Sequence, residues 1–246
     1  MTRHRADRLL VERGIFASRT AAQAAIGAGL VSADGVKVEK ASQPLAPDVR
    51  IEASPVHPYV SRGGVKVAAA LDHFAVDPQG KICLDVGSST GGFTEVLLRR
   101  GARLVCAVDV GTKQLHESLA RREDVVVLES TDIRNVTPAQ LPDRPDLVVV
   151  DVSFISLKLV LPAISLLAAS RSTIIALIKP QFEAGRSAVR KGVVRDPAVH
   201  EAVCADIAAA AAGLGWQVRG VIDSPIEGGD GNREFLLCAE RNAMAS

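Results

Sequence analysis

The chain has 246 residues, of which 48% are apolar, a length that suits one substantial hydrophobic core and a small additional module. Its formal net charge of +1 excludes a strongly basic or acidic protein, so any surface for nucleic acid has to be local. The four cysteines lack C-x-x-C spacing and the five histidines do not cluster, which predicts reduced thiols, no metal site and a cytoplasmic protein.

Residues 1–54 are predicted to form a small, separate α+β unit. Its first ten residues contain no apolar run of the length found in signal peptides. Two helical patterns precede two short strands, which an Asp34-Gly35 turn joins into a hairpin. The predicted helices cover residues 6–11 and 20–26, and the strands cover 30–32 and 36–38. Basic side chains gather here, and a solvated surface explains each of them nearly as well as RNA contact does; they are Arg3, Arg5, Arg8, Arg19 and Lys37.

Residues 55–61 are predicted to form a linker, because Pro55 and Pro58 resist both helix and sheet continuation. The second domain is predicted to cover residues 62–246, and it opens with a helical pattern that includes Lys66. A cation near a helix start is unfavourable to the helix dipole by about a few tenths of a kcal/mol. The position of this lysine therefore suggests a function.

The stretch 81–95 predicts a ligand site. A buried parallel strand over residues 82–86 stops at a glycine-rich turn, which lets the backbone approach a bound molecule closely, and Asp85 lies at the carboxyl end of that strand. The turn has G-x-x-x-G-G spacing, not the G-x-G-x-x-G of dinucleotide sites, and an acid beside it suits a cationic sulfonium better than a diphosphate. The candidate turn residues are Gly87, Ser88, Ser89, Thr90, Gly91, Gly92 and Phe93.

Two more acids follow the next two strands. Asp109 comes after the strand over 104–108, at an offset that suits an acid holding the hydroxyls of a ribose. Asp132 comes shortly after the strand over 125–128, where it could accept from an adenine amino group. Three acids at three successive strand ends predict S-adenosylmethionine as the cofactor. Each acid taken singly could instead cap a helix in an ordinary α/β turn.

The later strands are predicted to deliver charges to the same sheet edge. A strand that starts at residue 146 delivers Asp151, and another over 172–178 delivers Lys179. Glu234 opens the last strand, 235–239, which follows a helix from Pro197 to near Gly213 and a strand over 218–223. The apolar window 157–178 contains a proline and two cations, so it predicts helix, loop and strand, not a membrane span. A basic segment over 185–195 is interpreted as a mobile flap over the substrate, with Arg186, Arg190 and Lys191 as candidate contacts.

Alternating strands and helices predict an α/β domain with a mostly parallel, Rossmann-like sheet. Four charges of alternating sign would meet at its edge: Lys66, Asp151, Lys179 and Glu234. A lysine amine can remove the proton of a ribose 2′-hydroxyl only when the amine itself is neutral. Burial and a neighbouring cation favour the neutral amine, whereas the two carboxylates hold the amines in place but oppose their neutral form.

The order of these motifs resembles the hemolysin A (TlyA-type) ribosomal RNA methyltransferases. The resemblance rests on Lys66 and on the segments D-V-G-S-S-T-G-G-F-T (85–94), D-V-S-F-I-S (151–156), I-K-P-Q-F-E (178–183), K-G-V-V-R-D (191–196) and G-N-R-E-F (231–235). It covers nearly the whole chain. Members of that family combine an S4 RNA-binding domain with an FtsJ-like methyltransferase domain, which implies a class I methyltransferase fold with a seven-stranded sheet here.

The resemblance also implies an activity: S-adenosylmethionine-dependent 2′-O-methylation of cytidine in ribosomal RNA, on the large subunit and in some members also on the small. Ribosomal RNA or ribosomal subunits are the expected partner, and the sequence leaves open which of the two is the substrate. It implies catalytic roles for Lys66, Asp151, Lys179 and Glu234, with Lys179 as the expected general base. The cofactor pocket would include the glycine turn together with Asp85, Asp109 and Asp132. Neither a metal nor a membrane partner is expected.

Other classes of function fit parts of the sequence. A non-enzymatic RNA-binding or ribosome-assembly factor could use the Rossmann domain as a scaffold, and a failure to bind S-adenosylmethionine would favour it. A pore-forming toxin, which the family name suggests, lacks support because the sequence contains no spanning segment and no long basic amphipathic helix. The missing G-x-G-x-x-G disfavours a nicotinamide oxidoreductase, although the fold alone would not exclude it.

Overall fold

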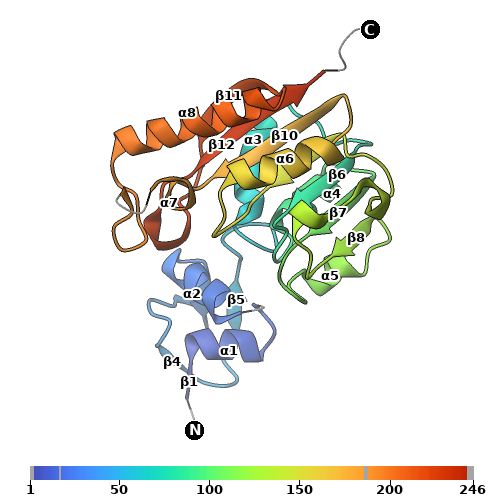
Figure 1. Cartoon of the computed structure of the whole chain (residues 1–246). Helices are drawn as coiled ribbons and strands as arrows, with labels where there is room; N and C mark the ends of the chain where they lie inside the picture. Colours follow the sequence, from blue (N-terminus) through green and yellow to red (C-terminus); the bar gives the residue numbers. More distant parts are fainter. Residues whose placement is uncertain (1–2, 17, 186–187, 243–246) are drawn as a thin grey trace. The chain divides into compact units, whose positions relative to one another are not determined.

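The structure, a computed structural model, describes residues 3–16, 18–185 and 188–242. The chain divides into two compact units, and the boundary lies between Pro58 and Tyr59 (Figure 1). This boundary falls inside the segment predicted as a linker. The predicted contact residue Arg186 lies outside the described residues.

The first unit packs two helices on short strands around its own apolar core. Leu10, Ala22 and Ile26 from the helices and Val31 from a strand are buried together. The elements are β1 (His4–Arg5), α1 (Ala6–Glu12), α2 (Arg19–Gly27), β2 (Val31–Ala33), β3 (Val36–Lys37), β4 (Pro44–Leu45) and β5 (Ile51–Ala53). Asp34 and Gly35 both have positive φ angles, 50° and 78°, so β2 and β3 are joined by the tight Asp-Gly hairpin that the sequence predicts.

The second unit is built on a seven-stranded sheet with the order β11-β12-β10-β9-β6-β7-β8. Five neighbouring strands, from β10 to β8, are parallel, and β12 runs antiparallel to both β10 and β11. The strands are β6 (Ile82–Val86), β7 (Leu104–Val108), β8 (Val125–Leu128), β9 (Leu147–Val150), β10 (Ser172–Ile178), β11 (Gln217–Asp223) and β12 (Phe235–Arg241). The prediction of a mostly parallel, Rossmann-like sheet is confirmed.

Helices cover both faces of this sheet and give it two apolar cores. Leu84 and Val86 of β6 pack with α6 and α8 on one face, whereas Cys83 packs with α3 and α4 on the other. All five β6 residues are buried, which is why this strand reads as a continuous apolar run interrupted only by Asp85. The helices are α3 (Gly63–His73), α4 (Gly92–Arg99), α5 (Glu117–Ala120), α6 (Leu157–Leu167), α7 (Pro180–Glu183) and α8 (Pro197–Gly213), with short 3-10 turns η1 (Ile133–Asn135), η2 (Pro138–Gln140) and η4 (Gly229–Gly231).

The sheet reverses its order of strand addition between β6 and β9. These two strands are neighbours in the sheet, although β7 and β8 lie between them in the chain. The loops that leave their carboxyl ends therefore diverge to opposite sides and open a crevice, the place where ligands bind in folds of this type.

Candidate active site

The turn after β6 requires a left-handed backbone at several positions, which glycine adopts without strain. Gly87, Ser89 and Gly91 have positive φ angles of 82°, 45° and 95°, and α4 begins directly afterwards. A Cβ atom on Gly87 would lie 2.4 Å from the backbone oxygen of Asp151. The loop after β6 and the loop after β9 thus touch through backbone, and any side chain at Gly87 would push them apart.

Asp109 fixes this turn to the end of β7. Its Oδ2 accepts from the backbone N–H of Ser89 at 2.8 Å, and its Oδ1 accepts from the N–H of Gly111 at 2.7 Å. The side chain lies in the wall of a cavity of about 960 Å³ to which Gly87 and Ser89 also contribute. Each carboxylate oxygen retains a second lone pair for a ligand.

Asp132 lies in the wall of the same cavity, but a neighbour already engages it. Arg134 donates to both of its carboxylate oxygens, with Nη2 to Oδ2 at 2.5 Å, and this guanidinium holds the pKa of Asp132 below its ordinary value. An adenine amino group at this carboxylate would therefore share it with Arg134.

Asp85 lies beneath the glycine turn and is fully buried. Its Oδ2 accepts from the Thr94 hydroxyl at 2.6 Å, while its buried Oδ1 has no hydrogen-bond partner among the described residues. Burial raises the pKa of this carboxyl from 3.8 to about 7; the Thr94 hydrogen bond lowers it, and the charges of Asp151 and Asp109 raise it further. Asp85 is absent from the walls of both cavities at this edge of the sheet, although it directly precedes Val86 and Gly87, which line them.

The buried carboxyl predicts a measurable pH dependence of stability. Below about pH 4 it is protonated in both states; between about pH 4 and pH 7 it ionises only in the unfolded chain, so the free energy of unfolding falls as the pH rises. The gap between the two pKa values corresponds to about 4 kcal/mol. We expect Asp85→Asn, which does not titrate, to gain stability relative to the parent chain across this window. Urea unfolding followed by the single tryptophan, Trp216, measures the difference; a difference independent of pH would contradict the assignment.

Lys179 and Asp151 form the first of two lysine–carboxylate pairs at the carboxyl edge of the sheet. Lys179 lies between β10 and α7, and Asp151 directly follows β9. The Nζ atom is 2.6 Å from Asp151 Oδ1 and donates to the Ser153 hydroxyl at 2.8 Å. The contact with Asp151 is a close ion pair, but Oδ1 receives no well-aligned hydrogen bond. The lysine and aspartate side chains are 11% and 23% exposed, so the pair can reach a ligand.

Lys66 and Glu234 form the second pair, and it is more deeply buried. Lys66 Nζ donates to Glu234 Oε2 at 2.5 Å, with the two side chains 10% and 2% exposed. Lys66 comes from the first turn of α3, and Glu234 from the residue before β12. The carboxylate rests against Gly228, where an added Cβ would lie 2.0 Å from Oε1. The buried carboxylate explains how a cation is held at this helix start.

A second, smaller cavity of about 220 Å³ brings the two pairs together. Lys66 and Asp151 both belong to its wall, as do Gly87 and Ser89. Asp151, Gly87 and Ser89 also belong to the wall of the larger cavity. One member of each pair therefore lines the smaller cavity beside the glycine turn, and Lys179 and Glu234, which line neither cavity, contact those two residues directly.

The remaining predicted turn residues lie at the same place in different environments. Ser88, Thr90, Gly92 and Phe93 contribute to the smaller cavity, and the buried Ser88 hydroxyl has no hydrogen-bond partner among the described residues. Gly91 lies in neither wall, and a Cβ there would lie 2.4 Å from Leu119 Cδ1, so its role is to let the turn pack on α5.

The predicted RNA-contact residues fall into two groups. Arg190 and Lys191 are exposed in a two-residue turn, in which Arg190 and Val193 exchange backbone hydrogen bonds at 3.0 Å. Buried Asn232 holds this turn: its amide donates to Gly192 O at 2.9 Å. In the first unit all five predicted contact residues are exposed: Arg3, Arg5, Arg8, Arg19 and Lys37.

Sequence reasoning missed three residues of the site. Ser153 accepts from Lys179, Asn232 anchors the basic turn, and Phe154 is 90% exposed beside Phe182, with ring centroids 4.9 Å apart. The first and third belong to the D-V-S-F segment, whose run of polar and aromatic residues after a buried strand was the available signal. For Asn232, the signal was a polar residue within a glycine-rich loop just before Glu234.

The described residues offer neither a metal-binding cluster nor a membrane-spanning helix. No group of three or more His, Cys, Asp or Glu side chains in the described ranges is arranged to hold a metal ion. Within the same ranges, no helix has both the length and the apolar character that crossing a membrane requires.

Comparisons with known proteins identify the family of this chain. The FtsJ-like methyltransferase family model matches residues 59–241. The chain is 45% identical over 238 residues to the Mycobacterium tuberculosis protein named 16S/23S rRNA (cytidine-2′-O)-methyltransferase TlyA, covering 96% of this chain and 89% of the relative. It is 37% identical over 234 residues to hemolysin A of Brachyspira hyodysenteriae, covering 94% and 98% of the two chains. A solved Streptococcus thermophilus structure titled as a hemolysin is 39% identical, with a TM-score of 0.79 over 98% of this chain and 90% of that one. The chain therefore belongs to the FtsJ-like methyltransferases and, within them, to the TlyA/hemolysin A family.

Proposed function

We propose that this protein is an S-adenosylmethionine-dependent methyltransferase that modifies the 2′-hydroxyl of cytidine in ribosomal RNA. One observation supports the reaction most directly: one member of each lysine–carboxylate pair, Lys66 and Asp151, lines a cavity beside the glycine turn, and Asp151 also lines the larger cavity. The names of relatives, which state rRNA and cytidine, support the substrate.

The described residues fit S-adenosylmethionine. The larger cavity of about 960 Å³ has room for a nucleoside, and Asp109 presents a carboxylate that two backbone N–H groups already orient. The unpartnered buried oxygens of Asp85 and Ser88 lie next to this turn. Gly87, Ser89 and Asp132, which line the same cavity, would complete the cofactor site. The bound cofactor supplies an electrophilic methyl group.

Lys179 is the proposed general base. Its Nζ takes the proton of the ribose 2′-hydroxyl, which makes that oxygen a competent nucleophile. Asp151 and Ser153 hold the amine in one position, at 2.6 Å and 2.8 Å. The amine can accept this proton only in its neutral form.

Lys66 and Glu234 have a positioning and electrostatic role in this proposal. Glu234 fixes the ammonium group of Lys66, and Lys66 lines the smaller cavity together with Asp151. A fixed cation there stabilises negative charge that develops on the ribose oxygen as its proton leaves.

Each domain has its own role in this proposal. Residues 1–54 act as an S4-like RNA-binding domain, residues 55–61 as a linker, and residues 62–246 as the methyltransferase domain. RNA contacts come from Arg190 and Lys191 in the second domain and from the five predicted basic residues of the first, which are Arg3, Arg5, Arg8, Arg19 and Lys37. Arg186 remains a proposed contact outside the described residues. A ribosomal RNA substrate would place the protein's work in the cytoplasm.

Methyl-group mapping tests the function. Ribosomal RNA from both subunits, naked and assembled, is incubated with the purified protein and S-adenosylmethionine, and 2′-O-methyl positions are mapped with and without the protein. We expect new 2′-O-methylcytidine in at least one substrate. Calorimetry with S-adenosylmethionine alone separates the failures: binding without methylation means that the substrate is wrong, and a folded protein that binds no cofactor contradicts the enzymatic function.

A further inference from the structure

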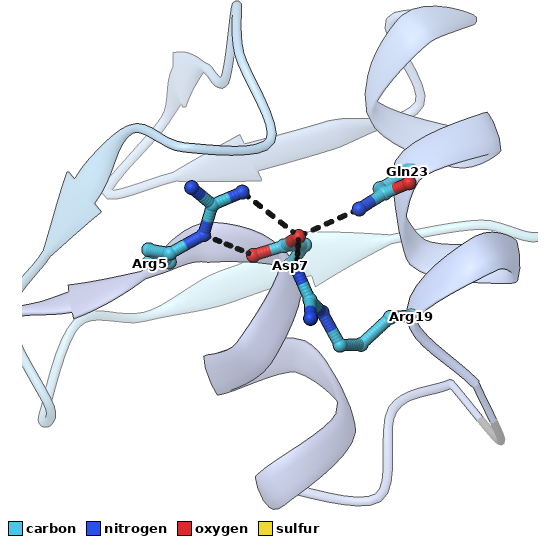
Figure 2. Close-up of polar contacts among 4 residues, drawn as sticks. All are labelled: Arg5, Asp7, Arg19 and Gln23. Carbon is cyan, nitrogen blue, oxygen red and sulfur yellow. Dashed lines mark hydrogen bonds and ion pairs between the residues drawn. The ribbon is translucent and has the colours of Figure 1, made fainter.

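The first unit contains a buried carboxylate on which two arginines converge. Asp7, in the first turn of α1, is fully buried. Arg5 donates through Nε to Oδ1 at 3.1 Å and through Nη2 to Oδ2 at 3.2 Å. Arg19 and Gln23, both on α2, donate to Oδ2 at 2.8 Å and 2.7 Å. Figure 2 shows all three donors pointing at the one carboxylate from two sides.

This cluster keeps an excess of positive charge at the surface. The Arg5 and Arg19 side chains are 46% and 48% exposed, although the carboxylate they share has no exposure. The arginine hydrogen bonds hold the pKa of Asp7 well below its ordinary value, so the carboxylate stays charged at any working pH. Two cations and one anion leave a net charge of +1, and the anion offsets the repulsion between the guanidinium groups.

Each guanidinium also keeps donors that Asp7 does not use. Arg5 Nη1 and Arg19 Nε and Nη1 make no hydrogen bond to any described residue. A guanidinium has a planar fork of donors, so one edge can bind a carboxylate while another faces a phosphate. A side chain already held in one orientation loses less conformational entropy when it binds a ligand.

We propose that Asp7 and Gln23 are positioning residues that lock Arg5 and Arg19 into a preformed clamp for the phosphodiester backbone of RNA. The inference rests on the proposed function, because it concerns how the ribosomal RNA substrate is held. The clamp differs from an ordinary basic face in that orientation, and not charge alone, determines affinity. It differs from a purely structural pin between α1 and α2 in that its loss weakens RNA binding in variants that remain folded.

Asp7→Asn separates the clamp from a basic face by the sign of its effect. Removal of a negative charge from a basic surface strengthens RNA binding if charge alone matters. The clamp predicts the opposite, about tenfold weaker binding, because the arginines lose their shared anchor. Binding of full-length protein to deproteinised large-subunit ribosomal RNA, at low and at physiological salt, is the measurement. Tighter binding by a folded variant would overturn the clamp.

Because Asp7→Asn removes a buried anion and could unfold the first unit, Arg19→Lys provides a second test. Lysine keeps the charge but lacks the planar fork, so the clamp predicts about tenfold weaker binding with a nearly unchanged salt dependence. The matched control is Arg50→Lys in the same unit, where Arg50 pairs with exposed Glu52 at 2.9 Å and binding should stay within about twofold. Equal binding by both variants and the parent would overturn the clamp. A parent chain that binds no ribosomal RNA would instead overturn the proposed function.

Discussion

Lys179→Ala is expected to reduce methyl transfer by about 100- to 10,000-fold, the usual contribution of a general base. The variant loses the amine that accepts the 2′-hydroxyl proton, whereas the cofactor cavity keeps Asp109 and the glycine turn. Affinity for S-adenosylmethionine should therefore change by no more than about threefold. Single-turnover methylation and calorimetry measure the two quantities separately.

Two further variants make this prediction specific. Lys179→Arg should be about as inactive as the alanine variant, because an arginine keeps its proton and cannot act as a base. Lys158→Ala is the control: Lys158 pairs with Asp206 on an exposed surface and should keep full activity. Near-normal turnover by Lys179→Ala would remove the assignment of this residue as the base.

Glu234→Ala is expected to lower the free energy of unfolding of the second unit by about 3–5 kcal/mol. The substitution leaves the Lys66 ammonium without its partner at a site where the lysine side chain is only 10% exposed. Methylation should fall as well, since Lys66 is no longer held in the wall of the smaller cavity. Urea unfolding monitored by Trp216 fluorescence measures the stability.

The double variant Lys66→Met with Glu234→Leu separates stability from catalysis. Replacing both members of a buried pair by apolar residues is often neutral or stabilising, so it should recover most of the stability lost in Glu234→Ala and yet remain inactive. The control Asp206→Ala breaks an exposed pair and should cost about 1 kcal/mol or less. If Glu234→Ala costs no more than this control, the pair contributes nothing to the fold.

Much of the second unit could be predicted because its strands are continuous apolar runs with sharp ends. The predicted bounds of β6, β7, β8 and β10 agree with the structure, and each strand stops at a polar or glycine residue. β6 is wholly buried and β7 and β10 are nearly so, whereas β8, at the edge of the sheet, exposes Val127. Local signals were weaker elsewhere. The strands β1, β4 and β5 have two or three residues each, too few for a period-two pattern.

The partners within the site could not be predicted. Lys66 and Glu234 are 168 residues apart in the chain, and their contact depends on β12 entering the sheet beside β10. Which acid pairs with which lysine is decided by that topology and not by any local pattern. The full burial of Asp85 could not be predicted from the sequence either, because the side chain of an acid at a strand end can face a ligand or the protein interior.

Asp151 belongs to the walls of both cavities, and its neighbour Gly87 touches its backbone. A charged ligand in either cavity would change the electric potential at this shared carboxylate. Binding in one cavity would therefore alter the affinity of the other cavity for its ligand, even where the two ligands make no contact. Thermodynamic linkage requires such coupling to be reciprocal: by whatever factor the RNA alters the affinity for the methyl donor, the donor alters the affinity for RNA equally. A methyl donor with a positive charge would be attracted to this carboxylate more strongly than the uncharged product that it becomes.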